Sequence, residues 1–190
     1  STTEEQEKMA DTEEKESEES QDLEEDMESY STLAVTMHHA SVTEKEQTFR
    51  VFLEGTSLEK SLVLDPKENL TENTGTFENL KDGTYVLRME APGFAVYEQK
   101  IVMEGYHYSV NVATGDSTDP GDGRIPYGDL NQDGVVDKKD AISVVDALEE
   151  DKTDAVYDLN GDGKVNLVDL DTAVKWFTDV SAQPEEAKIK

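Results

Sequence analysis

The chain has 190 residues and carries 45 acidic against 17 basic residues, a formal charge of −28 at pH 7. Such an excess suits a protein that holds divalent cations, and it disfavours nucleic acid and anionic membranes as partners because like charges repel. With no cysteine and no run of about 18 apolar residues, the sequence predicts neither disulfides, nor Cys-ligated zinc, nor a membrane-spanning helix. Ser1 in place of an initiator Met indicates a mature chain or a fragment of a longer one.

Residues 1–30 form an acidic segment. They include 14 acidic residues, two lysines and few apolar side chains. Such a segment cannot bury enough surface to offset the entropy of ordering the chain, so we expect a disordered linker. A solvated helix is the alternative, because Glu, Lys and Gln favour helices, but no apolar stripe would fix that helix to another element.

Residues 31–115 contain short β-branched and aromatic runs separated by turn signals, a pattern typical of strands. In one of these runs Tyr85, Leu87 and Met89 alternate onto a single strand face. Six or seven such strands predict a small all-β sandwich of the immunoglobulin or prealbumin type. The runs are Leu33–Met37, Phe49–Leu53, Leu62–Leu64, Tyr85–Met89, Val96–Met103 and Tyr108–Val112.

A glycine–aromatic phrase runs through the second half of this region. Its parts are Gly75-Thr76-Phe77, Leu80, Asp82-Gly83-Thr84-Tyr85, Leu87 and Ala91-Pro92-Gly93-Phe94. The phrase resembles the carboxypeptidase-regulatory-like and Cna-B-type prealbumin-like sandwiches, where it spans a strand, a turn and the next strand. The resemblance covers residues 75–112 and implies a spacer or a stabilising neighbour. Residues 116–126, rich in Pro, Gly and Asp, then predict a short linker.

Two twelve-residue segments, 129–140 and 158–169, follow with the same ligand pattern at an offset of 29 residues. Calcium takes about six to eight oxygen ligands, and such a loop supplies them at positions 1, 3, 5, 7, 9 and 12 around a sharp turn at glycine 6. A pair of Asx-turns would not explain the matched glycines and twelfth positions, and magnesium needs a tighter octahedral geometry. The expected ligands of two calcium ions are Asp129, Asn131, Asp133, Val135, Asp137 and Asp140 in loop 1, and Asp158, Asn160, Asp162, Lys164, Asn166 and Asp169 in loop 2.

The loops differ from those of sensor EF-hands in two respects. Asp replaces Glu at position 12, and the segment 125–128, Ile-Pro-Tyr-Gly, cannot form a helix ahead of loop 1. Helical patterns follow the loops instead, over Ala141–Glu149 and Leu170–Asp179. This duplicated loop–helix unit resembles the dockerin family, and a β-sandwich directly before it resembles an X module. The resemblance implies a multidomain chain: acidic linker 1–30, all-β sandwich 31–115, linker 116–126, small all-α calcium-binding dockerin 127–182 and tail 183–190.

Numbered from its first Asp, each repeat presents two helix faces. Positions 8, 13, 16 and 20 should form a shared core: Val136, Ala141, Val144 and Leu148, then Val165, Leu170, Ala173 and Phe177. Apolar residues on the opposite face, at positions 10, 11, 14, 17 and 18, suggest an interface, unless this small domain wraps them into its own core. In dockerins this face contacts cohesin, so the resemblance implies the partner-binding residues Lys138, Lys139, Ile142, Val145 and Asp146, and Leu167, Val168, Asp171, Val174 and Lys175.

The two repeats also differ from each other. Positions 10 and 11 are Lys138-Lys139 in the first repeat and Leu167-Val168 in the second, so we expect one dominant binding orientation. Loop 1 has four carboxylates and loop 2 has three, which predicts tighter calcium binding by loop 1. Tyr127 and Pro184, at the two ends of the unit, could form a stacked clasp or lie exposed.

The resemblance implies a non-catalytic, calcium-dependent module that docks onto a cohesin domain of a scaffoldin or a cell-surface anchoring protein. It would attach its parent protein to a cellulosome-type polysaccharide-degrading complex or to the bacterial cell surface, and hence would be secreted. The alternatives are a secreted adhesin or spacer whose sandwich binds the ligand, and a calcium sensor, against which the missing entering helices count. No enzyme is predicted, because His38 and His39 point to opposite strand faces and no nucleophile accompanies them or His107.

Overall fold

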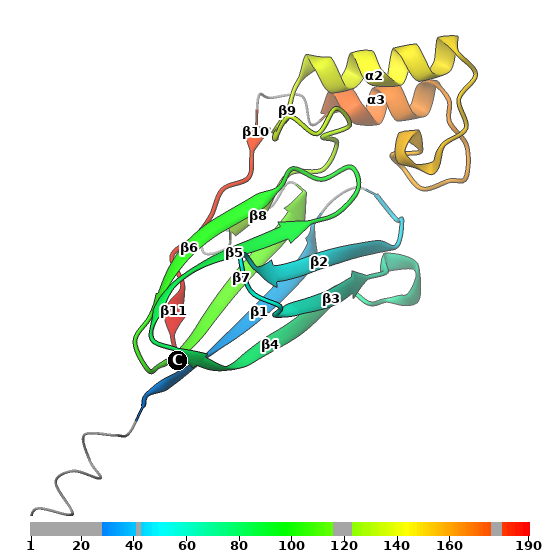
Figure 1. The fold of residues 1–190 in the computed structure, drawn as a ribbon. Coiled ribbons are helices and arrows are strands. Elements are labelled where there is room, and N and C mark those ends of the chain that lie inside the picture. The colour runs from blue at the N-terminus through cyan, green and yellow to red at the C-terminus, as the bar shows by residue number, and fades with distance from the viewer. Residues whose placement is uncertain (1–27, 41–42, 116–122, 176–179) are drawn as a thin grey trace, which may run out of the picture.

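The computed structural model describes residues 28–40, 43–115, 123–175 and 180–190, so nearly all of the expected acidic linker lies outside it. Between residues 30 and 115, two facing sheets form the predicted β-sandwich (Figure 1). The strands are β1 Tyr30–Ala40, β2 Gln47–Leu53, β3 Glu59–Leu64, β4 Glu72–Lys81, β5 Gly83–Glu90, β6 Tyr97–Met103 and β7 His107–Gly115. A short 3₁₀ helix, η1 Pro66–Glu68, joins β3 to β4.

One sheet has the order β3-β2-β5-β6 and is antiparallel. In the other sheet β1 lies between β4, to which it is antiparallel, and β7, to which it is parallel. The strand β4 was not among the predicted runs, because its Asn and Gly residues have low strand propensity. Pairing with β1 sets its register, and Phe77 of β4 lies opposite Leu33.

The core lies between the sheets and follows the alternation of strand side chains. In β6 every second residue is buried, from Tyr97 to Met103, and β2 shows the same pattern with Phe49, Val51 and Leu53 inside. This period-two burial is what a strand with one core face and one solvent face requires. The one strand face assigned from the sequence, that of Tyr85, Leu87 and Met89, is also a core face: Leu87 and Met89 are buried, and Tyr85 packs against the core.

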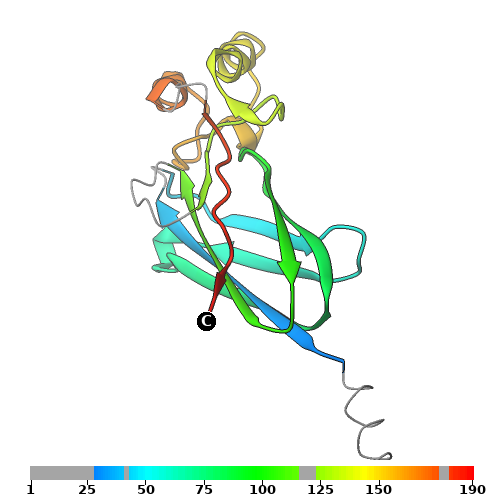
Figure 2. The ribbon, with the colours of Figure 1, turned by 90° about the vertical axis from the view of Figure 1, so that its left-hand side faces the viewer.

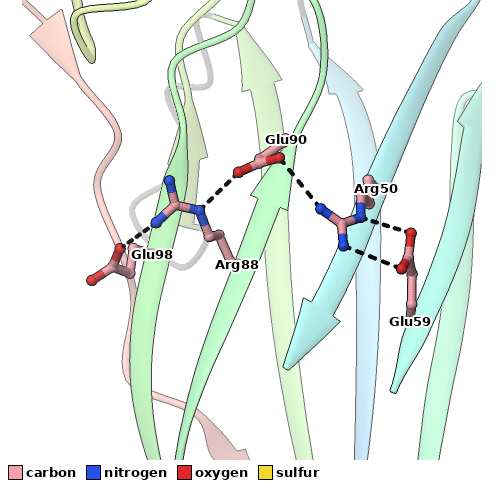
Figure 3. A network of polar contacts seen from close by, with 5 residues as sticks. All are labelled: Arg50, Glu59, Arg88, Glu90 and Glu98. Atoms are coloured by element: carbon pink, nitrogen blue, oxygen red, sulfur yellow. Dashed lines mark hydrogen bonds and ion pairs between the residues drawn. The ribbon is translucent and has the colours of Figure 1, made fainter. Parts of the chain in front are cut away.

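The outer face of the β3-β2-β5-β6 sheet carries a ladder of ion pairs (Figure 3). Arg50 contacts Glu59 at 2.7 Å and Glu90 at 3.9 Å, while Arg88 contacts Glu90 at 2.8 Å and Glu98 at 3.1 Å. Exposed pairs of this kind contribute at most about 1 kcal/mol each. Their effect is to match the charges across four strands, which leaves this face polar and solvated.

Two helices, α2 Lys138–Glu149 and α3 Leu167–Lys175, lie side by side above one end of the sandwich (Figure 1). Each begins three residues earlier than predicted, at position 10 of its loop. The cause in α2 is a capping box: the Asp137 carboxylate accepts the Lys139 N–H at 2.9 Å, and the Asp140 carboxylate accepts the Asp137 N–H at 2.8 Å. The predicted end of the second helix at Asp179, and Phe177 with it, lie outside the described residues.

In the described residues no α-helix leads directly into either loop. The segment before loop 1 is the short strand β8 Gly123–Ile125, and the segment before loop 2 is the 3₁₀ helix η2 Ala155–Tyr157. The strand β8 pairs in parallel with β7, so the prediction of a linker over 116–126 is wrong for its last residues. Its Ile125 is fully buried, because it packs into the sandwich core.

The last residues of the chain pair with both domains. The strand β10 Val180–Ser181, at the end of the segment predicted as dockerin, pairs with β9 Val135–Val136 inside loop 1. The predicted tail, residues 183–190, contains the strand β11 Lys188–Ile189, which pairs with β7 of the sandwich. In Figure 2 this segment runs down the side of the sandwich from the helices to the C-terminus. Backbone pairing therefore straps the helical part to the sandwich.

An aromatic contact joins the two parts at the start of loop 1. Tyr127 is 3% exposed and packs on Phe94, with ring centroids 4.7 Å apart, and Phe94 packs in turn on Phe49 of the core at 4.8 Å. The Gly93 carbonyl accepts the Asp129 N–H at 3.0 Å. Tyr127 thus belongs to the interface between domains, which corrects both expectations for it: it is not exposed, and its partner is Phe94 rather than Pro184, which is exposed.

Candidate functional site

Loop 1 folds around its own carboxylates. Asp129 accepts the Asp133 N–H at 3.2 Å and the Gly134 N–H at 2.9 Å, which brings position 1 against positions 5 and 6. Asp140, from the first turn of α2, accepts the Leu130 N–H at 2.8 Å. Gly134 has φ +90°, the left-handed conformation that glycine adopts without strain and that the turn requires. These contacts fold the loop around the carboxylates at positions 1 and 12.

Loop 2 repeats these contacts residue for residue. Asp158 accepts the Asp162 N–H at 3.2 Å and the Gly163 N–H at 2.9 Å. Asp169 accepts the Leu159 N–H at 2.8 Å, and Gly163 has φ +85°. At the start of α3, Asn166 takes the capping role, accepting the Val168 N–H at 2.8 Å. The duplication seen in the sequence is thus a duplication of structure.

The loop carboxylates at positions 1 and 12 are buried, and burial disfavours their charged form. Asp129, Asp140, Asp158 and Asp169, at positions 1 and 12 of the loops, are at most 8% exposed. Burial raises the pKa of Asp129 to about 6 and also raises the pKa of Asp140, because a carboxylate loses hydration in a closed site. Each loop thereby holds two buried acids that a bound cation would stabilise as anions.

The donor set fits calcium. In each loop a side-chain amide (Asn131 or Asn160) adds an oxygen beside the carboxylates, and residue 7 (Val135 or Lys164) offers its backbone carbonyl. Within the described ranges no group of three acidic or imidazole side chains is arranged to hold a metal ion. The loop carboxylates accept N–H groups of their own loop instead. All-oxygen ligands on a flexible loop suit calcium better than zinc or magnesium.

The predicted partner-binding residues lie on the helix surface away from the small core. Leu167 is 72% exposed, Ile142 is 53% exposed, and Val168 and Val174 are each 51% exposed. The remaining members with described side chains, Val145, Lys138, Lys139, Asp146 and Asp171, are also exposed, while the side chain of Lys175 is not described. The domain does not wrap these apolar residues into its own core.

The core prediction for the helices holds in part. Val136, Val144 and Ala173 are buried, and Ala141, Leu148 and Leu170 pack against the core. Val165 is half-buried, and Phe177 is not described. Sequence reasoning missed Ala147 and Leu159, each 1% exposed. Leu159 is position 2 of loop 2, which the ligand pattern leaves undefined.

The sandwich also contacts loop 2 directly, and no sequence pattern predicted this contact. Lys45 donates from its ammonium group to the Ala155 carbonyl at 2.5 Å, and Lys67 donates to the Gly161 carbonyl at 3.0 Å. Burial lowers the pKa of Lys45, while the carboxylates of Asp158 and Asp169 act to raise it. Two cations of the sandwich therefore lie beside loop 2.

A cavity of about 660 Å³ opens between the outer sheet face and loop 1. Its lining includes Arg50, Arg88 and Glu90 on the sandwich side and Leu130 and Gln132 on the loop side. The two arginines and the glutamate already bind one another. Glu59 and Glu98, outside the lining, pair with the same two arginines, so both cations of the described lining are already paired.

Comparison with known proteins decides the nature of the C-terminal part. Residues 127–175 match the model of the dockerin type I domain family. The C-terminal part of the chain is a dockerin domain. Dockerin domains in general bind calcium, in agreement with the two loops. A comparison with curated proteins found no match, and in the described residues no helix is long and apolar enough to cross a membrane.

Two solved structures share the fold of the whole described chain. Both are interface mutants of a type II cohesin–X–dockerin complex from Acetivibrio cellulolyticus. They are 20% and 21% identical, with TM-scores of 0.52 and 0.51, and each match covers 80% of this chain and 97% of the other. The chain therefore has the fold of an X module followed by a dockerin.

The contact between sandwich and dockerin predicts a steric effect at Gly161. A Cβ there would lie 2.6 Å from Lys45 Cγ and 2.9 Å from the Lys45 backbone nitrogen. Gly161→Gln should therefore destabilise the protein by about 1–3 kcal/mol relative to Gly55→Gln, measured by urea denaturation in excess calcium. Gly55 is a matched control, because its φ of +75° equals the +76° of Gly161 within a degree and nothing lies within 4 Å of its Cβ position. Equal losses of unfolding free energy in both variants would show that the contact between Lys45 and Gly161 does not contribute to stability.

Proposed function

We propose that this chain is a calcium-dependent docking unit whose dockerin domain binds a cohesin domain of a scaffoldin or a cell-surface anchoring protein. The observation that carries the proposal is the exposed apolar face of α2 and α3, on a domain of the dockerin family. Ile142 on α2 and Leu167, Val168 and Val174 on α3 are each at least half exposed, and soluble proteins rarely expose large apolar patches without a partner. A partner that covers this face would bury these apolar side chains, as at the centre of a specific interface.

In this proposal each loop holds one calcium ion through its own six ligand residues, which were named above. The ions would complete the buried carboxylate sites, and each site is continuous with the first turn of a helix through its residues at positions 9 and 12. Calcium therefore orders the two helices that carry the docking face. The ions act as structural parts of the interface rather than as catalysts.

The sandwich serves as a rigid neighbour of the dockerin. Tyr127 on Phe94, β8 on β7 and the strap of β10 and β11 all join the two domains. We keep the division of the chain into sandwich, dockerin and acidic N-terminal linker as a proposal, with 123–125 and the C-terminal residues assigned to the shared structure. Both domains are non-catalytic here, and the unit would work outside the cell or at its surface.

The comparisons differ in the class of cohesin that they suggest for this dockerin. The family model is that of type I dockerins, whereas the similar solved complexes contain a type II cohesin. A pull-down of the full chain with immobilised type I and type II cohesins, in calcium and in chelator, tests the proposal. Retention by at least one cohesin in calcium and release in chelator is expected. Equal retention under both conditions would contradict calcium-dependent docking.

The alternative is an adhesin whose sandwich binds the ligand. It predicts retention of the chain on polysaccharide or another matrix when α2 and α3 are unfolded, and no retention on any cohesin. Both arginines of the cavity lining are already paired with glutamates, so the cavity does not favour this function.

A further inference from the structure

The two calcium loops differ at position 4, where the ligand pattern makes no demand. Loop 1 has Gln132 with φ +58°, and loop 2 has Gly161 with φ +76°. The backbone is left-handed in both, so the loop itself accepts a side chain there, as Gln132 proves. The absence of a side chain at Gly161 therefore needs a cause outside the loop.

That cause is the sandwich segment between β1 and β2. A Cβ at Gly161 would meet Lys45 from both its backbone and its side chain at less than 3.0 Å. The Glu44 N–H points to the Asn160 carbonyl, position 3 of the same loop, at 3.5 Å. Glycine at position 161 thus leaves the space in which Lys45 of the sandwich packs against loop 2. The sandwich meets the start of loop 1 differently, through the neutral carbonyl of Gly93.

The contact brings charge as well as shape. The ammonium groups of Lys45 and Lys67 are fixed on the Ala155 and Gly161 carbonyls, at the approach to the loop and inside it. Loop 2 itself carries the carboxylates of Asp158, Asp162 and Asp169. The lysines therefore partly neutralise these carboxylates in the absence of an ion, and they repel a dication that binds among them.

We propose that Lys45 and Lys67 act as counter-cations that lower the calcium affinity of loop 2, so that the sandwich widens the difference in calcium affinity between the two loops. Loop 1, with four carboxylates and no lysine from the sandwich hydrogen-bonded to its backbone in the described residues, fills first. Loop 2 fills at higher calcium. This inference rests on the proposed binding of one ion by each loop.

The test is a calcium titration of the full chain followed by ¹H–¹⁵N NMR at Gly134 and Gly163. These amides donate to Asp129 and Asp158 of their own loops, so each reports on one site. In the Lys45→Gln/Lys67→Gln variant the free calcium concentration at which the Gly163 amide signal is half changed should fall by about threefold to tenfold, because two repulsive charges are gone. The corresponding midpoint concentration for Gly134 should not change.

The matched control is Lys60→Gln/Lys100→Gln, which makes the same change in net charge at two exposed lysines of the β3-β2-β5-β6 sheet. It should leave both midpoints in place. Lys67→Gln alone, at an exposed side chain, should shift Gly163 in the same direction by less, which covers the case in which the double variant fails to fold. A Gly163 midpoint that stays or rises in the lysine variants would overturn the inference. If neither amide responds to calcium in the wild-type chain, the proposed function fails with it.

Discussion

Removal of calcium is expected to unfold α2 and α3 while the sandwich keeps its strands. The helical domain has a small core, centred on Val144, Ala147 and Ala173, and it buries four carboxylates at positions 1 and 12 of its loops. Without an ion these acids lose their counter-charge, and so small a core cannot offset the cost. The binding free energy of calcium is then part of the folding free energy of the domain.

Hydrogen exchange by mass spectrometry, with calcium and with chelator, resolves this prediction along the chain. Peptides covering α2 and α3 should lose nearly all protection in chelator, and peptides covering β1, β2, β5 and β6 should keep theirs. Helical circular dichroism should fall in parallel. Magnesium in excess is the control, and it should not restore protection because its octahedral demand does not suit these loops. Helices that remain protected in chelator would contradict the account.

Leu167→Asp/Val168→Asp is expected to lower the affinity for a cohesin by about 100-fold or more. Both side chains are more than half exposed on the first turn of α3, so the substitutions leave the core untouched. In a complex they would place two charges at a desolvated interface centre, where truncation of single residues commonly costs about 2 kcal/mol or more. Calorimetric titration in saturating calcium measures the loss, and unchanged circular dichroism excludes misfolding.

The matched variant is Lys138→Glu/Lys139→Glu, at the same two positions of the first repeat. These exposed lysines should behave as rim charges, with a change of about tenfold or less that weakens further at high salt. The contrast follows from one dominant binding orientation, with the second repeat at the centre of the interface. Equal, partial losses from both variants would contradict that orientation and favour two.

The sequence predicted the local features of this structure well. Alternation predicted the shared face of Tyr85, Leu87 and Met89, of which Leu87 and Met89 are buried, and the repeated ligand spacing predicted two loops that have matched hydrogen bonds. Both signals are short-range, because a strand face and a calcium loop are each built within about twelve residues. The start of each helix was misplaced by three residues, since Asp137 and Asn166 serve as caps as well as loop residues.

The long-range features were beyond sequence reasoning. Nothing at Lys45 or Lys67 marks them as neighbours of a loop more than 90 residues away, and Gly161 is unremarkable until Lys45 is seen against it. The strands β10 and β11 are too short to carry a strand pattern, yet they pair with loop 1 and with β7. These contacts depend on how two independently patterned domains meet, which no local periodicity records.

The central claim is that calcium builds a docking face for cohesin on this chain. The most direct measurement is a calorimetric titration of the full chain with a cohesin that retains it, in calcium, in chelator, and with the Asp140→Asn/Asp169→Asn variant. One-to-one binding is expected in calcium, with no detectable binding in chelator or for the variant. Binding of the same affinity in chelator would contradict the claim.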